Sequence, residues 1–308
     1  MSFKEIKFGF AAAEKEKSDS PQLLMQGFFD AYGYISEIIG MNKFLILGPK
    51  GSGKSAIGAR LELLSDSNKM FFTKQYYLTS FPYKPFSSIA LSSEAPETKL
   101  PINWEFILLI ASLNSFIEDP TCKYHRNHKI DAVINALKNE GILPSEDLAQ
   151  IVKISSNKQF MVNLKSIISG QKSSQSEKVP FNIEKLFATL QSLCYSLQMK
   201  FMHYIIIDGL DDALTQRSIQ YQSLSALILA ADRMNDKFKT NKVNARIIVL
   251  CRTDIFDKLG GPNKNKVRRD SGILLDWFQD VNDLKSTNII KLVNLRAELS
   301  LGRKIDIF

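Results

Sequence analysis

The chain has 308 residues, enough for one large or two modest domains. A hydrophobic content of 44% and a charged content of 23% are ordinary for a soluble globular protein. The most apolar uncharged run, residues 106–117, is too short and too polar in places to span a bilayer, so we expect no membrane segment. A net charge of +8 permits contact with nucleic acid without indicating it, because solvated lysine faces are the commoner cause.

The cysteines indicate a reducing compartment. Cys122, Cys194 and Cys251 are far apart and odd in number, which does not favour a disulfide framework. The first ten residues mix charges with aromatics and are followed by a charged run at 14–17, unlike a signal peptide. We therefore expect a cytoplasmic protein.

The first forty residues are expected to lead into the first strand. Residues 1–20 are interpreted as a loosely ordered arm, and an apolar helical pattern begins at Pro21 and runs to about Gly40. This pattern is typical of a helix, or a helix pair, beside that strand. Tyr32 and Tyr34 lie just upstream of it, where a ring would either stack on a nucleotide base or make an ordinary core contact.

A short apolar run ends in a glycine-rich turn. Lys43–Leu47 is expected to be a strand buried on both faces, and Gly48–Ser55 then fits the P-loop pattern G-x-x-x-x-G-K-[ST]. A helix-prone stretch follows at 56–64, and a chance turn with a surface lysine would explain neither flank. Backbone N–H groups and the helix dipole would hold phosphate, Lys54 would reach the β- and γ-phosphates, and Ser55 would bind Mg²⁺. The expected cofactor-binding residues are Gly48, Pro49, Lys50, Gly51, Ser52, Gly53, Lys54, Ser55 and Ala56.

The middle of the chain is expected to be a helical insert. A second strand at Met70–Leu78 is followed by a long loop that four prolines break. These prolines are Pro82, Pro85, Pro96 and Pro101. Beyond them, apolar periodicity predicts helices over about 104–117, 129–139 and 146–154, leaves 160–168 ambiguous, and is replaced at 170–178 by a polar stretch expected to be a flexible loop.

One group of soft ligands lies within this insert. Cys122, His125 and His128 have the metal-compatible spacing C-x₂-H-x₂-H. Zinc normally takes four ligands, and no fourth is evident. A polar loop between helices is therefore the preferred interpretation.

The second half of the chain alternates helices with strands, which predicts a parallel α/β sheet. The expected elements are helices at about 183–198 and 223–238, strands at 201–207 and 245–251, a basic loop at 260–270, a last strand at 272–278 and a last helix at 281–298.

The strand at 201–207 ends in an acidic turn, Asp208-Gly209-Leu210-Asp211-Asp212. An aspartate at the carboxyl end of a buried parallel strand lies where ligands of open α/β sheets bind, as in a Walker B motif. Asp208 would hold Mg²⁺ opposite Ser55, directly or through water, and Asp211 or Asp212 would orient the attacking water. The alternatives are a strand-end aspartate that caps a turn and an Asp-rich turn that caps a helix.

The strand at 245–251 also ends in polar residues, Arg252-Thr253-Asp254. Arg252 or Thr253 would sense the γ-phosphate from the neighbouring strand. Alternatively, Arg252 pairs with a carboxylate near the end of the sheet. The expected catalytic residues are Lys54, Asp208, Asp211, Asp212 and Arg252.

Four positive charges fall in the basic loop, at Lys264, Lys266, Arg268 and Arg269. Three interpretations are open: a solvated loop, a contact with nucleic-acid phosphates, or an arginine finger offered to a neighbouring subunit. If nucleic acid binds there, its affinity should fall steeply with salt and with loss of these charges.

Together, the three strand ends resemble those of the STAND and KAP groups of AAA-related P-loop NTPases. Those groups share an apolar strand followed by Asp-Gly-x-Asp-Asp/Glu, and an arginine that ends the next strand. More narrowly, the chain resembles bacterial P-loop ATPases labelled FunZ-like, and the residues that carry this likeness are Phe8-Gly9, Ala13-Glu14, Gly48–Ser55, Arg252-Thr253-Asp254-Ile255-Phe256 and Leu275-Asp276-Trp277. The resemblance implies ATP and Mg²⁺ as cofactors and a role in bacterial anti-phage defence.

The expected fold is an α/β P-loop NTPase sandwich of the AAA/STAND type, with a parallel sheet, the Arg252 strand between the P-loop and Asp208 strands, and a large helical insert. Its expected regions are 1–80, with the arm, the lead-in helices and the first part of the core, 81–180 as the insert, and 181–308 as the rest of the core with the start of a C-terminal helical part. AAA-type proteins usually carry a helical lid after the core. We expect this lid to be missing, supplied by a partner, or encoded beyond this sequence.

The leading hypothesis is a Mg²⁺-dependent ATPase that acts as the switch or motor subunit of a larger assembly, as a homo-oligomer or with an effector protein. The alternative is a nucleotide-dependent oligomeric scaffold, or a DNA-associated regulator, with little hydrolysis. A nucleotide kinase fits less well, because the acidic strand end is unlike theirs and no lid-like arginine cluster follows the P-loop closely. Phosphate release measured against oligomeric state, with and without DNA, separates the first two.

Overall fold

A computed structural model describes residues 6–30, 32–40, 43–89, 96–145, 147–169, 183–209, 218–260, 264–277 and 287–304. The chain forms two compact units. Unit 1 comprises Met1–Lys69, Leu250–Asp257 and Asn265–Phe308, and unit 2 comprises Met70–Val249 and Lys258–Lys264. The boundaries of these units differ from those of the three expected regions, since residue 80 lies inside unit 2.

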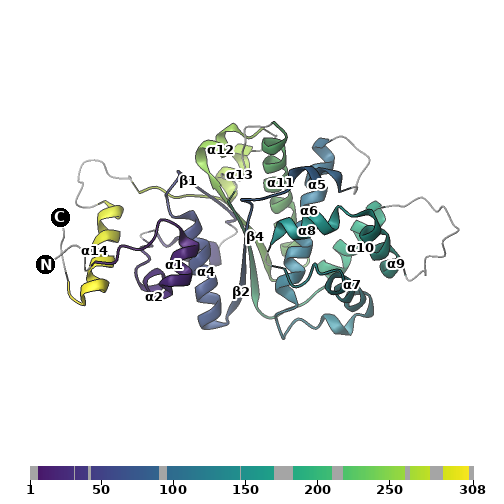
Figure 1. The fold of residues 1–308 in the computed structure, drawn as a ribbon, viewed down its shortest axis with the longest axis horizontal. Coiled ribbons are helices and arrows are strands. Elements are labelled where there is room, and N and C mark those ends of the chain that lie inside the picture. The colour runs from purple at the N-terminus through teal and green to yellow at the C-terminus, as the bar shows by residue number, and fades with distance from the viewer. Residues whose placement is uncertain are drawn as a thin grey trace. The chain divides into compact units, whose positions relative to one another are not determined.

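The fold is α/β, with five strands in the sheet order β2-β3-β4-β1-β5 (Figure 1). The strands are β1 Leu45–Gly48, β2 Phe71–Tyr77, β3 Met202–Asp208, β4 Ala245–Arg252 and β5 Gly272–Leu274. The β1–β5, β2–β3 and β3–β4 pairs are parallel, as the alternation of strands and helices predicts. The strand that ends in Arg252 lies between the other two motif strands in this order, as expected.

Unit 1 surrounds the glycine-rich loop with short helices. Its helices are α1 Ala13–Asp19, α2 Pro21–Gln26, α3 Tyr34–Gly40, α4 Lys54–Asn68 and α14 Asn288–Leu301, together with α12 Thr253–Lys258 and α13 Lys264–Ser271, which each reach the unit boundary. Helices α1 and α2 contact α4, and α14 contacts α2. The lead-in segment is therefore a helix pair, α2 and α3, whereas the arm expected over residues 1–20 is wrong at 13–19, where α1 forms.

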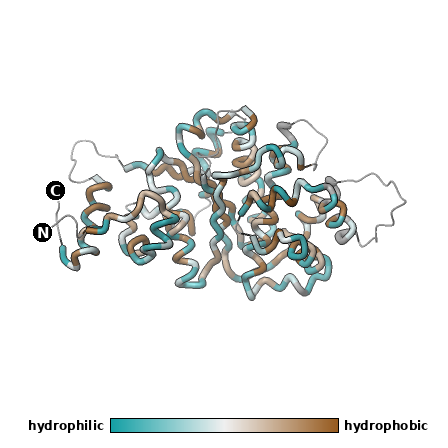
Figure 2. The backbone as a smooth tube through the Cα atoms, in the orientation of Figure 1, coloured by the Kyte–Doolittle hydropathy of each residue, from teal (hydrophilic) through white to brown (hydrophobic). Residues whose placement is uncertain are grey.

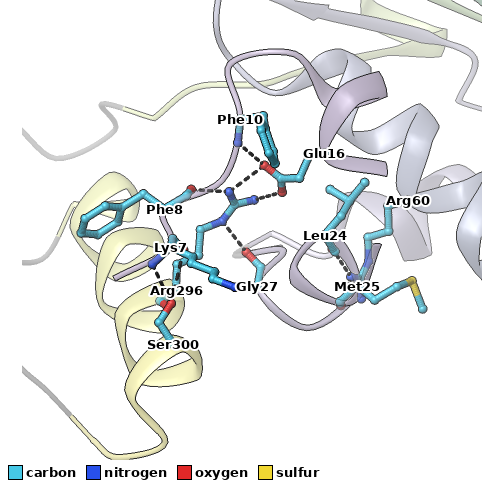
Figure 3. Close-up of polar contacts among 10 residues, drawn as sticks. All are labelled: Lys7, Phe8, Phe10, Glu16, Leu24, Met25, Gly27, Arg60, Arg296 and Ser300. Carbon is cyan, nitrogen blue, oxygen red and sulfur yellow. Dashed lines mark hydrogen bonds and ion pairs between the residues drawn. The ribbon is translucent and has the colours of Figure 1, made fainter. Parts of the chain in front are cut away.

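Figure 3 shows what orders this N-terminal segment. Glu16, on α1, is only 3% exposed, and its Oε1 accepts a hydrogen bond of 2.6 Å from Nη2 of Arg296 on α14. Arg296 also donates from Nε to the Gly27 carbonyl at 3.2 Å and from Nη1 to the Phe8 carbonyl. Because a buried carboxylate is costly without a partner, this arginine stabilises the packing of α1 and α14.

Unit 2 is built around α6, a helix that is apolar on nearly all sides. Every residue from Phe106 to Ala111 is 0% exposed, and α6 contacts α11, α8, α10 and strands β2 and β3. The helices of this unit are α5 Tyr83–Ser88, α6 Pro96–Phe116, the 3₁₀ turn η2 Tyr124–Arg126, α7 His128–Asn139, α8 Leu148–Ser155, α9 Lys158–Ser169, α10 Ile183–Tyr195 and α11 Ser218–Thr240. Figure 2 shows apolar and polar residues alternating along the outer helices. Among the described helices, none combines the length and the apolar character that crossing a bilayer requires.

The expected proline-broken loop is wrong. Pro85 lies inside α5, Pro96 is the first residue of α6, and Pro101 lies inside α6. A proline at the start of a helix loses no hydrogen bond, because the first N–H groups have no partner within the helix. Burial of α6 against neighbouring helices and strands then stabilises the helix despite the second proline.

Four other predicted elements differ from the structure or are resolved by it. The basic loop at 260–270 is wrong from Lys264 onward, because α13 forms there, and the ambiguous stretch at 160–168 lies in α9. Strand β5 ends at Leu274, earlier than expected, and α14 begins at Asn288. The polar stretch at 170–178 and the start of the last predicted helix fall outside the described residues.

Candidate phosphate-binding site

The loop between β1 and α4 has a backbone that its glycines permit. Gly51 and Gly53 have φ of +80° and +87°, the left-handed region that residues with a side chain rarely adopt. Gly48 is required for a different reason, because a Cβ there would collide with Oγ of Ser52 and lie 3.1 Å from Cβ of Leu275. The G-x-x-x-x-G spacing therefore corresponds to one tight turn around Ser52.

Lys54 is buried in this loop, although lysine side chains are usually exposed. The residue is only 7% exposed, and its Nζ donates to the carbonyl oxygens of Gly48 at 3.1 Å and Pro49 at 2.9 Å. An ammonium group is rarely buried without hydrogen-bond acceptors, and here loop carbonyls supply them. The loop thus holds a positive charge beside its own backbone, where an anion would be stabilised.

Two further features of the loop also fit an anion. Ser52 is 4% exposed, and its buried Oγ has no hydrogen-bond partner among the described residues. Helix α4 begins at Lys54, no side chain caps its N-terminus, and its first turn contains no acidic residue. A buried hydroxyl and an uncapped helix N-terminus both leave donors to be satisfied, and phosphate oxygens are suitable acceptors. The residues present therefore fit a bound phosphate group.

The segment that leaves β5 contacts the same loop. The N–H of Leu275 donates to the Leu47 carbonyl at 2.7 Å, and the indole Nε1 of Trp277 donates to the Ser52 carbonyl at 3.0 Å. The indole ring also faces Gly53, because a Cβ built there would lie 3.8 Å from it. No spacing rule predicted the Trp277 contact, and the sequence signalled it only through the family likeness.

The two tyrosines upstream of β1 make polar contacts within unit 1. The Tyr34 hydroxyl donates to the Leu274 carbonyl at 3.3 Å, and burial raises the pKa of Tyr34 to about 12. Tyr32 is 42% exposed, and its hydroxyl accepts a hydrogen bond from Asn288. Tyr34 is half-buried and Tyr32 is exposed, so neither ring lies in the core, and base stacking stays a prediction.

Asp208 is the last residue of β3 in unit 2 and is 4% exposed. Its Oδ2 accepts a hydrogen bond of 2.9 Å from Nε2 of Gln75, and its Oδ1 accepts one of 2.7 Å from the N–H of Gly209. Gly209 has φ of +76°, and a Cβ there would lie 3.2 Å from the backbone N of Leu78. The Asp-Gly pair therefore fits a carboxylate held at a strand end, and Gln75 is a positioning residue that the sequence reading missed.

The remaining predicted catalytic residues have different outcomes. Asp211 and Asp212 lie outside the described residues. Arg252 ends β4, and its Nε and Nη2 donate to the two carboxylate oxygens of Asp254 at 2.9 and 2.6 Å. These hydrogen bonds lower the pKa of Asp254. The structure thus contains the carboxylate pairing that was the alternative interpretation, and a role in sensing γ-phosphate stays a prediction.

The basic residues of α13 are not a uniform charged face. Arg268 pairs with Asp257 at 3.2 Å and Arg269 with Asp270 at 3.0 Å. Nζ of Lys264 donates to a backbone carbonyl, and Lys266 is exposed. Both arginines line a cavity of about 300 Å³ beside β5, so they are partly neutralised at its rim.

The side chain of His125 lies outside the described residues, and the described residues contain no cluster of potential metal ligands. Cys122 is buried, and burial raises the pKa of its thiol to about 11. His128 is an exposed first residue of α7. The polar loop between helices stays the preferred interpretation of this group.

No protein-family model, curated protein or solved structure matches this chain. The functional interpretation therefore depends on the loop geometry and on the residues that follow β3 and β4.

Proposed function

We propose that this chain binds a nucleoside triphosphate, preferring ATP, at the Gly48–Ser55 loop and hydrolyses it with Mg²⁺. In this proposal it serves as the switch or motor subunit of a larger assembly. The observation that carries the proposal is a buried lysine at the N-terminus of an uncapped helix, two residues after a buried serine hydroxyl that has no hydrogen-bond partner among the described residues. A buried hydroxyl without an acceptor is costly, and a phosphate oxygen would satisfy it.

The phosphates would replace contacts that the loop now makes with itself. Nζ of Lys54 would exchange the Gly48 and Pro49 carbonyls for oxygens of the β- and γ-phosphates. The hydroxyl of Ser52 would gain an acceptor, and the first N–H groups of α4 would gain the anion that helix N-termini favour. Binding therefore requires the Lys54 side chain to release two loop carbonyls, and the phosphate oxygens would replace these acceptors.

A metal ion would add the second half of the chemistry. We propose that Ser55, in the first turn of α4, provides a hydroxyl ligand to it, and the metal-binding role expected of Asp208, at the end of β3, stays a prediction. Mg²⁺ prefers hydroxyl, carboxylate and water oxygens, and it neutralises charge that develops between the β- and γ-phosphates. Asp211 or Asp212 would orient the attacking water, which gives the two aspartates a role in turnover and not in binding.

The central test is Lys54→Ala against a matched surface variant, Lys291→Ala, whose lysine is exposed on α14. We expect Lys54→Ala to lose ATP binding by at least about a hundredfold, as measured by calorimetry, while Lys291→Ala binds as wild type. Lys291→Ala should unfold at the wild-type urea midpoint, and Lys54→Ala should be folded in the absence of urea although it loses two hydrogen bonds of the loop. Normal ATP turnover by Lys54→Ala would overturn the proposal.

A second candidate is a nucleotide-dependent scaffold that binds ATP and scarcely hydrolyses it. The pairing of Arg252 with Asp254 favours it, because the arginine would have to leave this partner to reach a γ-phosphate. Phosphate release by wild type, Asp211→Ala and Asp212→Ala separates the candidates. An ATPase should lose release in at least one aspartate variant and keep binding, whereas a scaffold should show the same low release in all three.

A further inference from the structure

The contact between Trp277 and the loop has a consequence for phosphate binding. The indole Nε1 donates to the Ser52 carbonyl at 3.0 Å across 225 residues of sequence. Because a trans peptide unit is planar, the carbonyl of Ser52 and the N–H of Gly53 point in opposite directions. The hydrogen bond that fixes the direction of the carbonyl therefore also fixes the direction of the Gly53 N–H.

The backbone at this point would otherwise rotate at little cost. Ser52 stands between Gly51 and Gly53, both at positive φ, and glycine populates several backbone regions with similar energy. A rotation of the Ser52–Gly53 peptide would turn an N–H away from the phosphate position and put a carbonyl in its place. A carbonyl oxygen facing a phosphate is repulsive, so the loop needs a group that fixes this peptide.

The position of Trp277 is itself fixed by the strand that precedes it. Strand β5 pairs with β1, the N–H of Leu275 donates to the Leu47 carbonyl, and the Tyr34 hydroxyl donates to the Leu274 carbonyl. The indole is thus held against the loop from the end of the neighbouring strand. Trp277 is half-buried, so part of its side chain is exposed to solvent.

We propose that Trp277 is a positioning residue for phosphate binding, which acts by holding the Gly53 N–H in the phosphate-facing orientation. The inference rests on the proposed nucleotide function and names a residue outside the P-loop pattern that this function needs. Its indole also lies against the loop, so its emission should respond when phosphate binds. The chain has only two tryptophans, and Trp104 is 0% exposed in unit 2, where its indole donates to the Ser223 carbonyl.

The first experiment uses Trp104→Phe, which leaves Trp277 as the single tryptophan. ATP with Mg²⁺, and separately pyrophosphate, are titrated while indole emission is recorded. We expect a saturating change in emission whose midpoint equals the Kd from calorimetry. Unchanged emission at saturating ATP would overturn the inference.

The second experiment uses Trp277→Phe, which keeps an aromatic ring and removes the N–H donor. We expect the affinity for ATP and for pyrophosphate to fall roughly tenfold, the effect of one hydrogen bond, with the urea midpoint unchanged. Trp104→Phe is the control, expected to bind ATP as wild type. Wild-type affinity in Trp277→Phe, with binding lost in Lys54→Ala, would overturn this inference alone, whereas wild-type affinity in Lys54→Ala would overturn the nucleotide function.

Discussion

Polar side chains are buried both in the loop around Ser52 in unit 1 and in a cluster around His203 in unit 2. The two regions differ in whether the hydrogen bonds of these side chains are satisfied. In the cluster, Ser115 Oγ lies 2.8 Å from Nδ1 of His203, and Asp119 Oδ2 lies 3.3 Å from its Nε2. All three residues are at most 2% exposed. Serine, histidine and aspartate are the residue types of a hydrolytic triad, yet these three side chains are buried away from solvent.

The polar groups of the cluster form hydrogen bonds with one another. A neutral His203 that carries its proton on Nε2 donates to Asp119 and accepts from the Ser115 hydroxyl, so both ring nitrogens are used. Asp119 Oδ1 accepts from the N–H and hydroxyl of Thr121 at 2.7 Å each. The imidazole also stacks on Phe72 at a centroid distance of 4.9 Å. Nothing is left for a substrate to bind.

The loop in unit 1 contains fewer reactive residue types, but its donors are incompletely used. The Ser52 hydroxyl is buried and has no hydrogen-bond partner among the described residues, and the N-terminus of α4 has no side-chain cap. A phosphate group could satisfy these donors, whereas the cluster in unit 2 has its own acceptors. Variants in the two regions should therefore have opposite effects on stability and on binding.

The largest effect on stability is expected from Asp119→Ala. It leaves the Nε2–H of His203 buried without an acceptor and removes three hydrogen bonds to a carboxylate, at a cost of about 3 kcal/mol in the free energy of unfolding. Urea denaturation measures this cost, and calorimetry should show ATP affinity unchanged. Asp236→Ala, which removes an exposed carboxylate on α11, is the control expected to change neither quantity. Loss of ATP binding in folded Asp119→Ala would contradict the expectation that this cluster contributes to stability and not to binding.

The next effect is a dependence of stability on pH. Burial lowers the pKa of His203 from 6.5 to about 4, and the hydrogen bond to Asp119 opposes this only in part. Between these values the unfolded chain binds more protons than the folded one, so stability falls as pH falls from about 6.5 to about 4. We expect a loss of about 2–3 kcal/mol between pH 7.5 and pH 4.5 from this residue.

Two measurements check this dependence. Urea midpoints across the pH range should decline more steeply in wild type than in His203→Gln, which cannot titrate. NMR of the three histidines should show one ring that stays neutral to about pH 5 in the folded protein. Three histidine signals that all titrate near pH 6.5 would contradict the buried neutral state.

The two strand-end motifs could be predicted because spacing alone encodes their geometry. The glycines of the Gly48–Ser55 loop fall where φ is positive or a Cβ would collide, and Gly209 follows Asp208 because a side chain there would press on the backbone of Leu78. These are local requirements, so a sequence pattern records them. The parallel strand pairs were likewise predictable from the alternation of apolar strands with amphipathic helices.

What could not be predicted depends on residues far apart in the sequence. Glu16 belongs to a charged run, and only its pairing with Arg296, 280 residues away, explains its burial. The prolines of α5 and α6 disfavour helix locally, and tertiary packing outweighs them. Trp277 and Gln75 donate hydrogen bonds to Ser52 and Asp208, which lie 225 and 133 residues away from them in the sequence. No local pattern contains such contacts.

Arg252→Ala is expected to change stability least. This variant tests whether the arginine serves only the fold or also contacts the γ-phosphate. Asp254 is about half exposed, so solvent screens the pair and its loss should cost less than about 1 kcal/mol in urea denaturation. If the arginine pairs with Asp254 only as part of the fold, ATP binding and phosphate release should both stay at wild-type levels.

If Arg252 instead exchanges Asp254 for a γ-phosphate, Arg252→Ala should bind ATP within about threefold of wild type and lose phosphate release by about tenfold or more. Asp254→Ala is the matched variant, because it frees the arginine without removing it. Under the sensing role, Asp254→Ala should keep or raise the rate of release, since no carboxylate then competes for the guanidinium. Equal losses in both variants would show that the ion pair itself is needed, and Arg252 would then belong with the self-satisfied groups, as His203 does.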